Sequence, residues 1–430
     1  MPTPLQPEHS ESIQHAAEAL LDDAIAFLQG LIHIPTVNPP GNSYPECARY
    51  IGKHLHDLGY TVEYIELTPA EVAELAPYGE DMPRTNVVGR LAGPYASPTL
   101  HFNGHMDVVP VGSGWSTNPF GGEIHNKRIF GRGTSDMKGG IAAQIYAVEA
   151  IRHAGLRLQG TIEQSGVVDE ESTGNRNAGM GLLVERGYIS SKHTNYVVIT
   201  EPLNVDNICL GHRGAIWGEI TTFGLQSHGS TPERGINALE YMANFIAETT
   251  QELRPSLQQR LNSQPVMPPS ASAASLSFNT IQGGHNINSV PDRCTVSFDR
   301  RLVVSEHLDD ARRELQQVLE RQAQTLPGFR YEYTERYATD PTWVSADTPL
   351  VHAFTSAIQE VIGRGPGYVC SPGTDDQRFV VHNAGIEQCI IYGPGEITQT
   401  HITDESLALD DLLNSIKVMA LATATLLGVE

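Results

Sequence analysis

Apolar residues recur at helical spacing over residues 13–34, a pattern typical of an amphipathic helix that ends at Pro35. A second helical pattern covers residues 138–155. Short apolar runs around it predict strands at residues 86–93, 98–104, 160–168 and 195–200. Strands that alternate with helices indicate an α/β domain, in which helices flank a central twisted sheet.

The pattern changes after Arg213. The next 125 or so residues read as β-α-β-β-α-β, the order of a ferredoxin-like split unit, with strands at 214–224, 275–284, 293–303 and 329–337 and helices at 235–253 and 305–322. The earlier alternation then resumes, with helices at 347–363 and 406–427 and a strand at 387–395. We therefore expect a smaller α+β domain, residues 213–337, inserted into a larger α/β domain formed by residues 1–212 and 338–430.

Composition narrows the class of protein. A hydrophobic fraction of 40% and a charged fraction of 18% indicate a globular protein, and no run approaches the roughly 20 apolar residues of a membrane span. The first residues lack the basic and apolar regions of a secretory signal, so we expect a cytoplasmic location without membrane partners. A net charge of −22 argues against nucleic acid. The five scattered cysteines predict neither disulfides nor a thiolate site.

Candidate chemistry begins in the stretch HFNGHMDVVP. His105 follows a predicted strand, and reactive residues gather at the carboxyl ends of strands in α/β sheets. Asp107 is close enough in sequence to accept a hydrogen bond from the imidazole, which would make its other nitrogen a better metal donor. Taken alone, a strand-end histidine beside a turn-forming aspartate explains the pair equally well.

Several acidic residues also lie at the ends of predicted strands or just before a predicted helix. Asp136 precedes a predicted helix, Glu170 and Glu171 follow one strand, and Glu201 ends another. Each alone reads as a turn or a helix cap, but clustered like charges repel unless a cation or a shared proton offsets them. With His401, which follows a late strand, they would suit two zinc-like ions about 3.5–4 Å apart, bridged by one carboxylate, and one glutamate would remain as a base.

These segments together resemble the metal-dependent deacylases and peptidases of family M20, which include acetylornithine deacetylase, succinyl-diaminopimelate desuccinylase, aminoacylase-1 and glutamate carboxypeptidase. The resemblance runs along nearly the whole chain, through LIHIPTVNPPG, GHMDVVP, GRGTSDMKGG, DEES, TEP, SHGSTPERGINA, NSVPD and GPGEITQTHITDE. It implies a zinc-peptidase-like catalytic domain, with the inserted domain serving as a lid and dimerisation domain. A homodimer is therefore expected.

The resemblance also implies roles for the candidate residues. His105 and Glu201 would bind one divalent ion, Glu171 and His401 the other, and Asp136 would bridge them. Glu170 would be the general base, with Asp107 as the partner of His105. Zinc is the expected metal, with cobalt or manganese as alternatives, since mixed histidine and carboxylate sites accept all three.

Residues of the inserted domain complete the expected site. His228 would donate to the developing oxyanion, and Asn288 and Arg301 would contact a substrate carboxylate, with Arg300 as the alternative to Arg301. Three further residues near the site, for which a glycine turn with an aspartate cap is nearly as good an account, are Gly373, Thr374 and Asp375. The expected function is hydrolysis of an N-acyl amino acid or related small amide. A dipeptidase or carboxypeptidase on the same scaffold and a non-catalytic binding protein are the alternatives.

Overall fold

The computed structural model describes residues 5–76, 79, 82–171 and 176–430, and the chain divides into two compact units. Unit 1 comprises Met1–Gly211, Val344–Val369 and Asp375–Glu430. Unit 2 comprises His212–Trp343 and Cys370–Thr374. The α/β class with a second α+β body agrees with the class predicted from the sequence.

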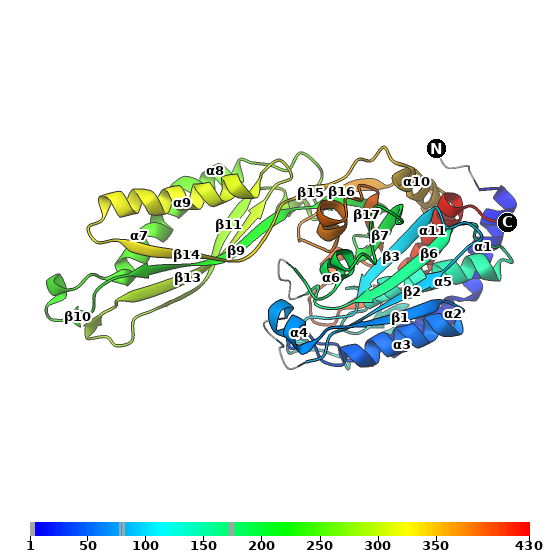
Figure 1. Ribbon diagram of the computed structural model, residues 1–430, viewed down its shortest axis with the longest axis horizontal. Coiled ribbons are helices and arrows are strands. Elements are labelled where there is room, and N and C mark those ends of the chain that lie inside the picture. The colour runs from blue at the N-terminus through cyan, green and yellow to red at the C-terminus, as the bar shows by residue number, and fades with distance from the viewer. Residues whose placement is uncertain (1–4, 77–78, 80–81, 172–175) are drawn as a thin grey trace. The chain divides into compact units, whose positions relative to one another are not determined.

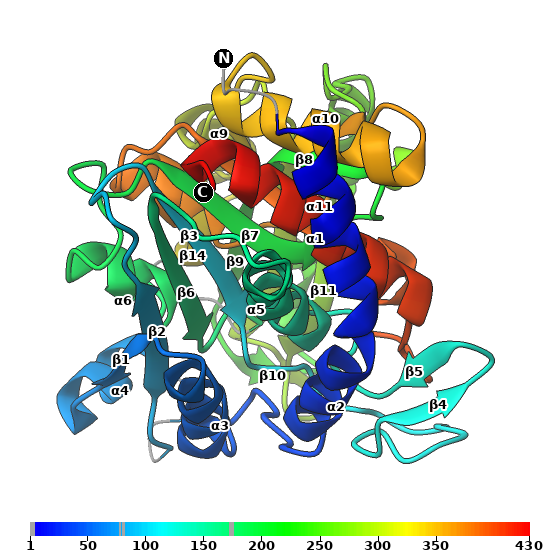
Figure 2. The same ribbon diagram turned by 90° about the vertical axis from the view of Figure 1, so that its right-hand side faces the viewer.

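Unit 1 is built on a mixed sheet (Figures 1 and 2). Its centre is parallel, because β3 pairs in parallel with β6 and β7, and β17 with β7. Antiparallel strands extend this parallel centre on both sides. The strands follow one another across the sheet in the order β1 (Thr61–Glu66), β2 (Thr85–Leu91), β6 (Thr161–Val167), β3 (Thr99–His105), β7 (Tyr196–Pro202), β17 (Cys389–Gly393) and β8 (Asn207–His212). The four parallel strands therefore present their carboxyl ends at one edge of the sheet.

Helices cover the sheet of unit 1. The almost fully buried α5 packs on β3, β6, β7 and β17, and α1, α2 and α11 pack on α5 in turn (Figure 2). At the end of the sheet formed by β1 and β2, α3 packs against these two strands. The helices of this unit are α1 (Pro7–Ala19), α2 (Leu21–Ile32), α3 (Tyr44–Asp57), α4 (Pro69–Leu75), α5 (Lys138–His153), α6 (Met180–Glu185), α10 (Pro349–Ile362) and α11 (Leu409–Leu427).

The first predicted helix is divided in the structure. Leu20 leaves the helical conformation, with φ −93° and ψ 1°, and its N–H bonds the carbonyl of Ala16. Both α1 and α2 nevertheless pack on α5, so one apolar stripe serves two helices. Periodicity predicted the buried face correctly, but it carries no signal for a break that leaves that face unchanged. A small sheet of β18 (Ser406–Ala408), β5 (Arg128–Phe130) and β4 (Glu123–His125) was not predicted.

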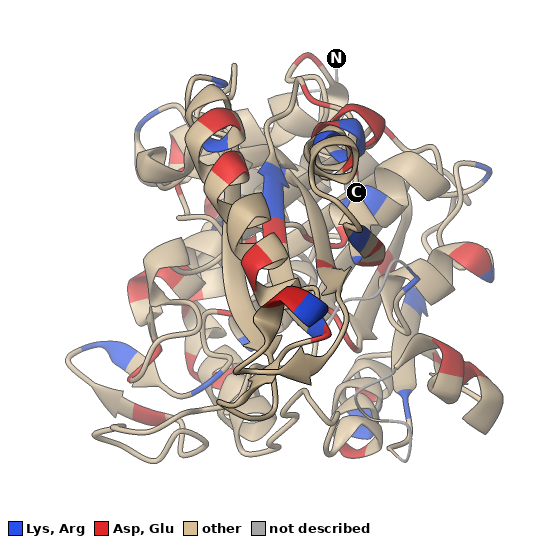
Figure 3. Cartoon of the chain, turned by 90° about the vertical axis from the view of Figure 1, so that its left-hand side faces the viewer, with Lys and Arg blue, Asp and Glu red and all other residues tan. Residues whose placement is uncertain are grey.

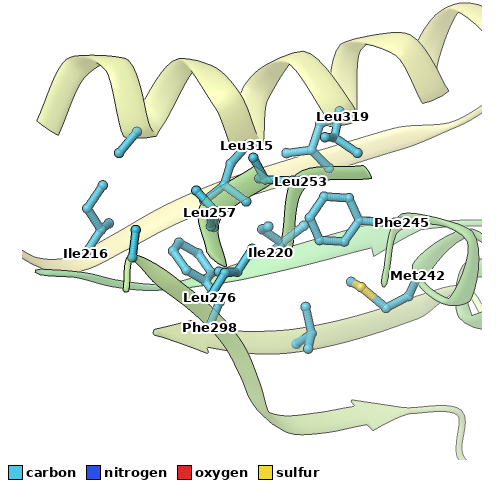
Figure 4. Close-up of a cluster of buried hydrophobic side chains, with 14 of the residues drawn as sticks. Ile216, Ile220, Met242, Phe245, Leu253, Leu257, Leu276, Phe298, Leu315 and Leu319 are labelled. Carbon is cyan, nitrogen blue, oxygen red and sulfur yellow. The ribbon is translucent and has the colours of Figure 1, made fainter. Parts of the chain in front are cut away.

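Unit 2 has the ferredoxin-like arrangement that the sequence predicted. Its antiparallel sheet has the order β11-β13-β9-β14, and α7, α8 and α9 pack on it (Figure 1). Figure 4 shows the core between sheet and helices, where Phe245, Phe298 and Leu315 are buried. The elements are β9 (Gly214–Phe223), α7 (Ala238–Glu248), α8 (Arg254–Gln258), β11 (Ser275–Gly283), β13 (Arg293–Leu302), α9 (Leu308–Thr325) and β14 (Arg330–Thr339).

The surface carries both signs of charge. Acidic residues are interspersed with basic ones along the helices, with more acidic residues in total, as the net charge of −22 requires (Figure 3). Within the described residues, no helix combines the length and the hydropathy of a membrane span.

Candidate metal centre

The predicted ligands of unit 1 gather at the carboxyl edge of the parallel strands. His105 is the last residue of β3, Glu201 lies near the end of β7, and Glu171 follows β6 by four residues. His401 lies in the loop after β17, and Asp136 directly precedes α5. Ligands collect at this edge in α/β sheets, because loops from neighbouring strands meet there.

Two clusters share one carboxylate. His105 Nε2 lies 3.1 Å from Asp136 Oδ1 and 3.3 Å from Glu201 Oε1. His401 Nε2 lies 3.3 Å from Asp136 Oδ2 and 3.0 Å from Glu171 Oε2. Within each cluster the possible ligand atoms lie within 4.8 Å of one another. Asp136 thus turns one carboxylate oxygen toward each histidine, the arrangement that a bridging ligand requires.

A buried glutamate that sequence reasoning missed holds the loop of Asp136. Glu405 Oε1 accepts the N–H groups of Gly133, Ser135 and Asp136 at 2.9–3.1 Å, and its Oε2 pairs with Arg132 at 2.7 Å. Glu405 is fully buried and lies four residues after His401, so it connects the two loops. The signal for Glu405 in the sequence was its position in the segment ITDE, which directly follows the predicted ligand His401.

Glu170 and Glu171 lie in a turn that Asp107 holds. The Oδ1 atom of Asp107 accepts the N–H of Glu170 at 3.2 Å, and its Oδ2 accepts that of Glu171 at 3.0 Å. His105 Nδ1 lies 3.0 Å from the main-chain carbonyl of Asp107 but 3.6 Å from its carboxylate. The expected imidazole bond is therefore made by the backbone, because the carboxylate is engaged with the turn.

The charges of the cluster determine its titration. Burial opposes ionisation of Asp136, but His105 and His401 outweigh it and hold its pKa well below the ordinary value. Hydrogen bonds to Asp136 and Glu171 raise the pKa of His401 to about 11. Burial raises the pKa of Glu170 well above its ordinary value, and the charges of Glu201 and Glu171 add to this. The carboxylates of the cluster therefore favour additional positive charge.

The donor set fits divalent ions. Histidine nitrogens and carboxylate oxygens are ordinary ligands of zinc, and each cluster offers three of them. Glu171 Oε1 is buried without a hydrogen-bond partner among the described residues, a costly state that a cation would relieve. Glu170 belongs to neither cluster, so it would remain available as a base.

A second carboxylate that sequence reasoning missed lies near Glu170. Asp376 is 1% exposed and accepts hydrogen bonds from Asn103 at 3.1 Å and Asn177 at 3.2 Å. Burial raises its pKa to about 6, and its charge contributes to the raised pKa of Glu170. Sequence reasoning chose the preceding Asp375, whose carboxylate accepts the N–H of Gln377 at 2.9 Å as a turn cap would. The sequence TDDQ alone does not show which of the two neighbouring aspartates faces the site.

In unit 2, His228 and Asn288 lie together. His228 in β10 (Ser227–His228) pairs with Ser289 in β12 (Ser289–Val290), the neighbour of Asn288. Both side chains are exposed, and Nδ1 of His228 lies 2.7 Å from Ser230 Oγ. This contact fixes the imidazole by its Nδ1 atom.

Arg301 lies at the other end of the unit 2 sheet. It pairs with Ala215, whereas Arg293, at the end of β13 nearest β10, pairs with Phe223. Arg301 Nε bonds Asp299 at 2.8 Å, and its guanidinium lies over Trp217. The alternative, Arg300, is fully buried and paired with Glu306 and Glu314, so it is occupied inside the unit.

The last three candidates lie where the chain passes from unit 2 to unit 1. Thr374 accepts a hydrogen bond from Tyr337 at 3.2 Å, and the N–H of Gly373 lies 3.3 Å from Ser371 Oγ, both within unit 2. Asp375 belongs to unit 1. These contacts describe a structured turn, and contact of the three residues with substrate stays a prediction.

Comparisons with known proteins agree with this geometry. Peptidase family M20/M25/M40 matches residues 101–425. A succinyl-diaminopimelate desuccinylase of Gluconacetobacter diazotrophicus is 28% identical over 94% of this chain and 97% of its own. Among solved structures, human carnosine dipeptidase 1 has a TM-score of 0.75 at 17% identity and covers 99% of both chains. A dinuclear metal binding peptidase of Bacillus subtilis has a TM-score of 0.67 at 16% identity, covering 95% of this chain and 99% of its own.

The fold and the paired clusters thus define a metal-dependent amide hydrolase. The chain belongs to peptidase family M20/M25/M40.

Proposed function

We propose that the protein removes the acyl group from an N-acyl amino acid or related small amide, using two divalent ions, with zinc as the preferred metal. The observation that carries the two-metal proposal is Asp136, whose two oxygens face different histidines in two overlapping clusters. The similarity to a succinyl-diaminopimelate desuccinylase over almost the whole chain supports the choice of an acylated amino acid.

The reaction assigns separate tasks to the residues of this chain. Two divalent ions held by the clusters would supply Lewis acidity at the scissile amide. Glu170, which lies outside both ligand clusters, takes a proton from the attacking water and later delivers it to the leaving amine. In this proposal His228 donates to the developing oxyanion.

Substrate recognition is proposed for the partly exposed Arg301 and the exposed Asn288 of unit 2. Arg301 offers a guanidinium that can form two parallel hydrogen bonds with a carboxylate, and Asn288 adds an amide. Arg301 and His228 are too far apart within one copy of unit 2 to touch one small substrate. From Arg293 to Arg301 the strand advances eight residues (301 − 293), about 26 Å at about 3.3 Å per residue. The strand β10, which carries His228, lies beyond the Arg293 end (Figure 1). We therefore propose a homodimer in which each site takes one of these groups from the partner.

A dipeptidase is the second candidate, supported by the fold shared with carnosine dipeptidase 1. The chemistry is the same, and only the groups that flank the amide differ. A non-catalytic binding protein is a third possibility. Glu170 argues against it, because a site that only binds metal has no need for a second glutamate beside the proposed ligand Glu171.

The test is a substrate panel with metal analysis. N-succinyl, N-acetyl and N-formyl amino acids are assayed beside dipeptides for release of free amine, before and after chelation. We expect acylated amino acids to be hydrolysed with the higher kcat/KM, and chelation followed by Zn²⁺ to abolish and restore the rate. Preference for dipeptides would favour the second candidate, and binding without amine release the third.

A further inference from the structure

A buried polar network lies behind the turn that carries Glu170 and Glu171. Its members are Asn38, Arg84, Asp107 and Asp169, all of them at most 3% exposed, and we call them the support network. They come from four separate segments of unit 1. Buried charges on this scale are tolerated only where each is paired and hydrogen-bonded.

The support network is continuous. Arg84 Nε pairs with Asp169 Oδ2 at 2.8 Å, and the Asn38 amide donates to Asp169 Oδ1 at 3.2 Å and to Asp107 Oδ2 at 3.0 Å. Asp107 in turn accepts the N–H groups of Glu170 and Glu171. The chain of bonds that starts at Arg84 therefore ends on the main-chain atoms of the proposed base and of a proposed metal ligand.

Asp169 holds an uncommon backbone conformation at the start of the turn. Its φ is +59°, the left-handed region that non-glycine residues seldom occupy. Tyr44 donates to Asp169 Oδ1 at 3.0 Å, in addition to the bonds from Asn38 and Arg84. Such a conformation persists where surrounding contacts over-determine it.

Arg84 is itself fixed by carbonyl oxygens. Its Nη2 donates to the carbonyl of Pro40 at 2.9 Å, and its Nη1 donates to those of Gly79 at 3.0 Å and Met82 at 2.9 Å. With its bond to Asp169, the guanidinium joins the turn to two other loops. A planar group with several donors can do this, whereas the single ammonium of lysine cannot.

We propose that Arg84 and Asp169 are positioning residues, which act through Asn38 and Asp107 to hold Glu170 and Glu171 where base and ligand are needed. This proposal rests on the proposed two-metal function. Neither Arg84 nor Asp169 belongs to either ligand cluster, so their effect would pass through the turn. Partners that orient metal ligands typically change metal affinity or activity by about 10–100-fold when they are replaced.

The experiment measures Zn²⁺ affinity without substrate. Metal-depleted protein is titrated with Zn²⁺ against a chelating dye, for wild type, Asp169→Asn and Arg84→Met, and kcat and KM are then measured on the best substrate. Glu163→Gln is the matched control. Glu163 lies on β6, the strand that leads into the turn, is 5% exposed and pairs with Arg90 at 2.6 Å, so it is also a buried ion-pair partner, but it bonds no residue of the turn.

We expect Asp169→Asn and Arg84→Met to weaken one of the two Zn²⁺ sites by about 10–100-fold and to lower kcat more than they raise KM. The control is expected to keep both Zn²⁺ affinities, even if its melting temperature falls. Zn²⁺ affinities in the network variants equal to those of the control would overturn the proposal, whatever happens to stability. If Arg84→Met does not fold, Asp169→Asn carries the test, because it preserves the size of the side chain.

Failure of the proposed function gives a different result. A wild-type protein that binds two Zn²⁺ ions yet releases no amine from any substrate would contradict the proposed hydrolysis, while the affinity comparison would still decide the role of Arg84 and Asp169.

Discussion

At the residue scale, Glu170 and Glu171 are neighbours in sequence with different surroundings. Glu171 Oε2 lies 3.0 Å from His401 Nε2 inside a ligand cluster, whereas Glu170 belongs to neither cluster. Asp107 accepts hydrogen bonds from the main-chain N–H groups of both residues, so the backbone of the two is held by one carboxylate while their side chains have different surroundings. One residue can thus act as base while the next binds metal.

Replacing each glutamate by glutamine should separate these roles. Glu170→Gln is expected to retain both metals while kcat falls by about 10²–10⁴, the usual effect of losing a general acid–base group. Glu171→Gln is expected to lose metal from one site, because it removes an anionic ligand. Metal content by elemental analysis and kcat on the same preparations provide the measurement. Equal metal loss in both variants would show that the two roles are wrongly divided.

Asp136 should be the residue on which both ions depend. Because its two oxygens face His105 and His401 separately, Asp136→Ala removes a ligand from both clusters at once. We expect metal content to fall from about two ions per chain to well below one. Asp404→Ala is the control, since this carboxylate lies in the loop of His401 but bonds the N–H of Ser116. Loss of a single ion in Asp136→Ala would exclude the bridging role.

At the element scale, an ion-pair cluster joins β13 to α9 inside unit 2. Glu306 precedes α9 and pairs with the buried Arg300 and with Arg260, the latter at 2.9 Å, and it accepts the N–H of Val303 at 2.9 Å. Burial opposes ionisation of Glu306, but the hydrogen bond from Arg300 and the other contacts outweigh it and hold its pKa below the ordinary value. The cluster therefore stabilises the folded unit while Glu306 is ionised.

Glu306→Gln should lower the free energy of unfolding by about 1–3 kcal/mol at neutral pH, since it leaves buried Arg300 short of a charged partner. Because the folded pKa is depressed, the contribution is present above pH 4.5, the ordinary value, and is lost as pH falls through the folded pKa. The difference between variant and wild type should therefore shrink in acid. Urea denaturation, followed by fluorescence of the unit 2 residues Trp217 and Trp343, measures it.

Glu335→Gln is the matched control for this prediction. Glu335 pairs with Arg312 at 2.7 Å in the same unit, but both side chains are partly exposed, and such pairs are worth about 0–1 kcal/mol. An effect of Glu306→Gln as small as that of Glu335→Gln, or one that does not change with pH, would contradict the role given to the buried cluster.

At the scale of the whole molecule, the distance between Arg301 and His228 within unit 2 supports sites shared between two chains. An inactive Glu170→Gln chain is mixed with an inactive His228→Ala chain under conditions that exchange subunits. With shared sites, one site of each heterodimer carries both defects and the other carries neither, so activity should return. Two-fold symmetric dimers make this exchange reciprocal.

The readout is the rate per verified heterodimer, and each variant mixed with itself is the control. Each heterodimer has one intact site of two, so about half the wild-type rate per heterodimer is expected; with random exchange about half the dimers are mixed, which gives about a quarter of the wild-type rate for the whole mixture. If each His228 served its own chain, every site would keep one defect. A mixture with confirmed heterodimers and no activity would therefore eliminate a site that takes His228 from the partner.

The sequence by itself predicted most of the elements and the residues that gather in the two clusters. Strand-end positions of His105, Glu171 and Glu201 are visible from local alternation, because a strand and its carboxyl end are properties of a few consecutive residues. The β-α-β-β-α-β order likewise predicted the ferredoxin-like unit, since it depends on the succession of elements alone.

Only the tertiary structure decided which polar groups meet. Asn38, Arg84 and Glu405 are far apart in sequence from the residues they hold, and each alone resembles an ordinary polar residue in a loop. It also decided that Arg300 is occupied and that Asp107 holds a turn, because burial and hydrogen-bond partners come from segments that are brought together only by packing. Periodicity records which face of an element is buried, whereas the partner across the core depends on the whole fold.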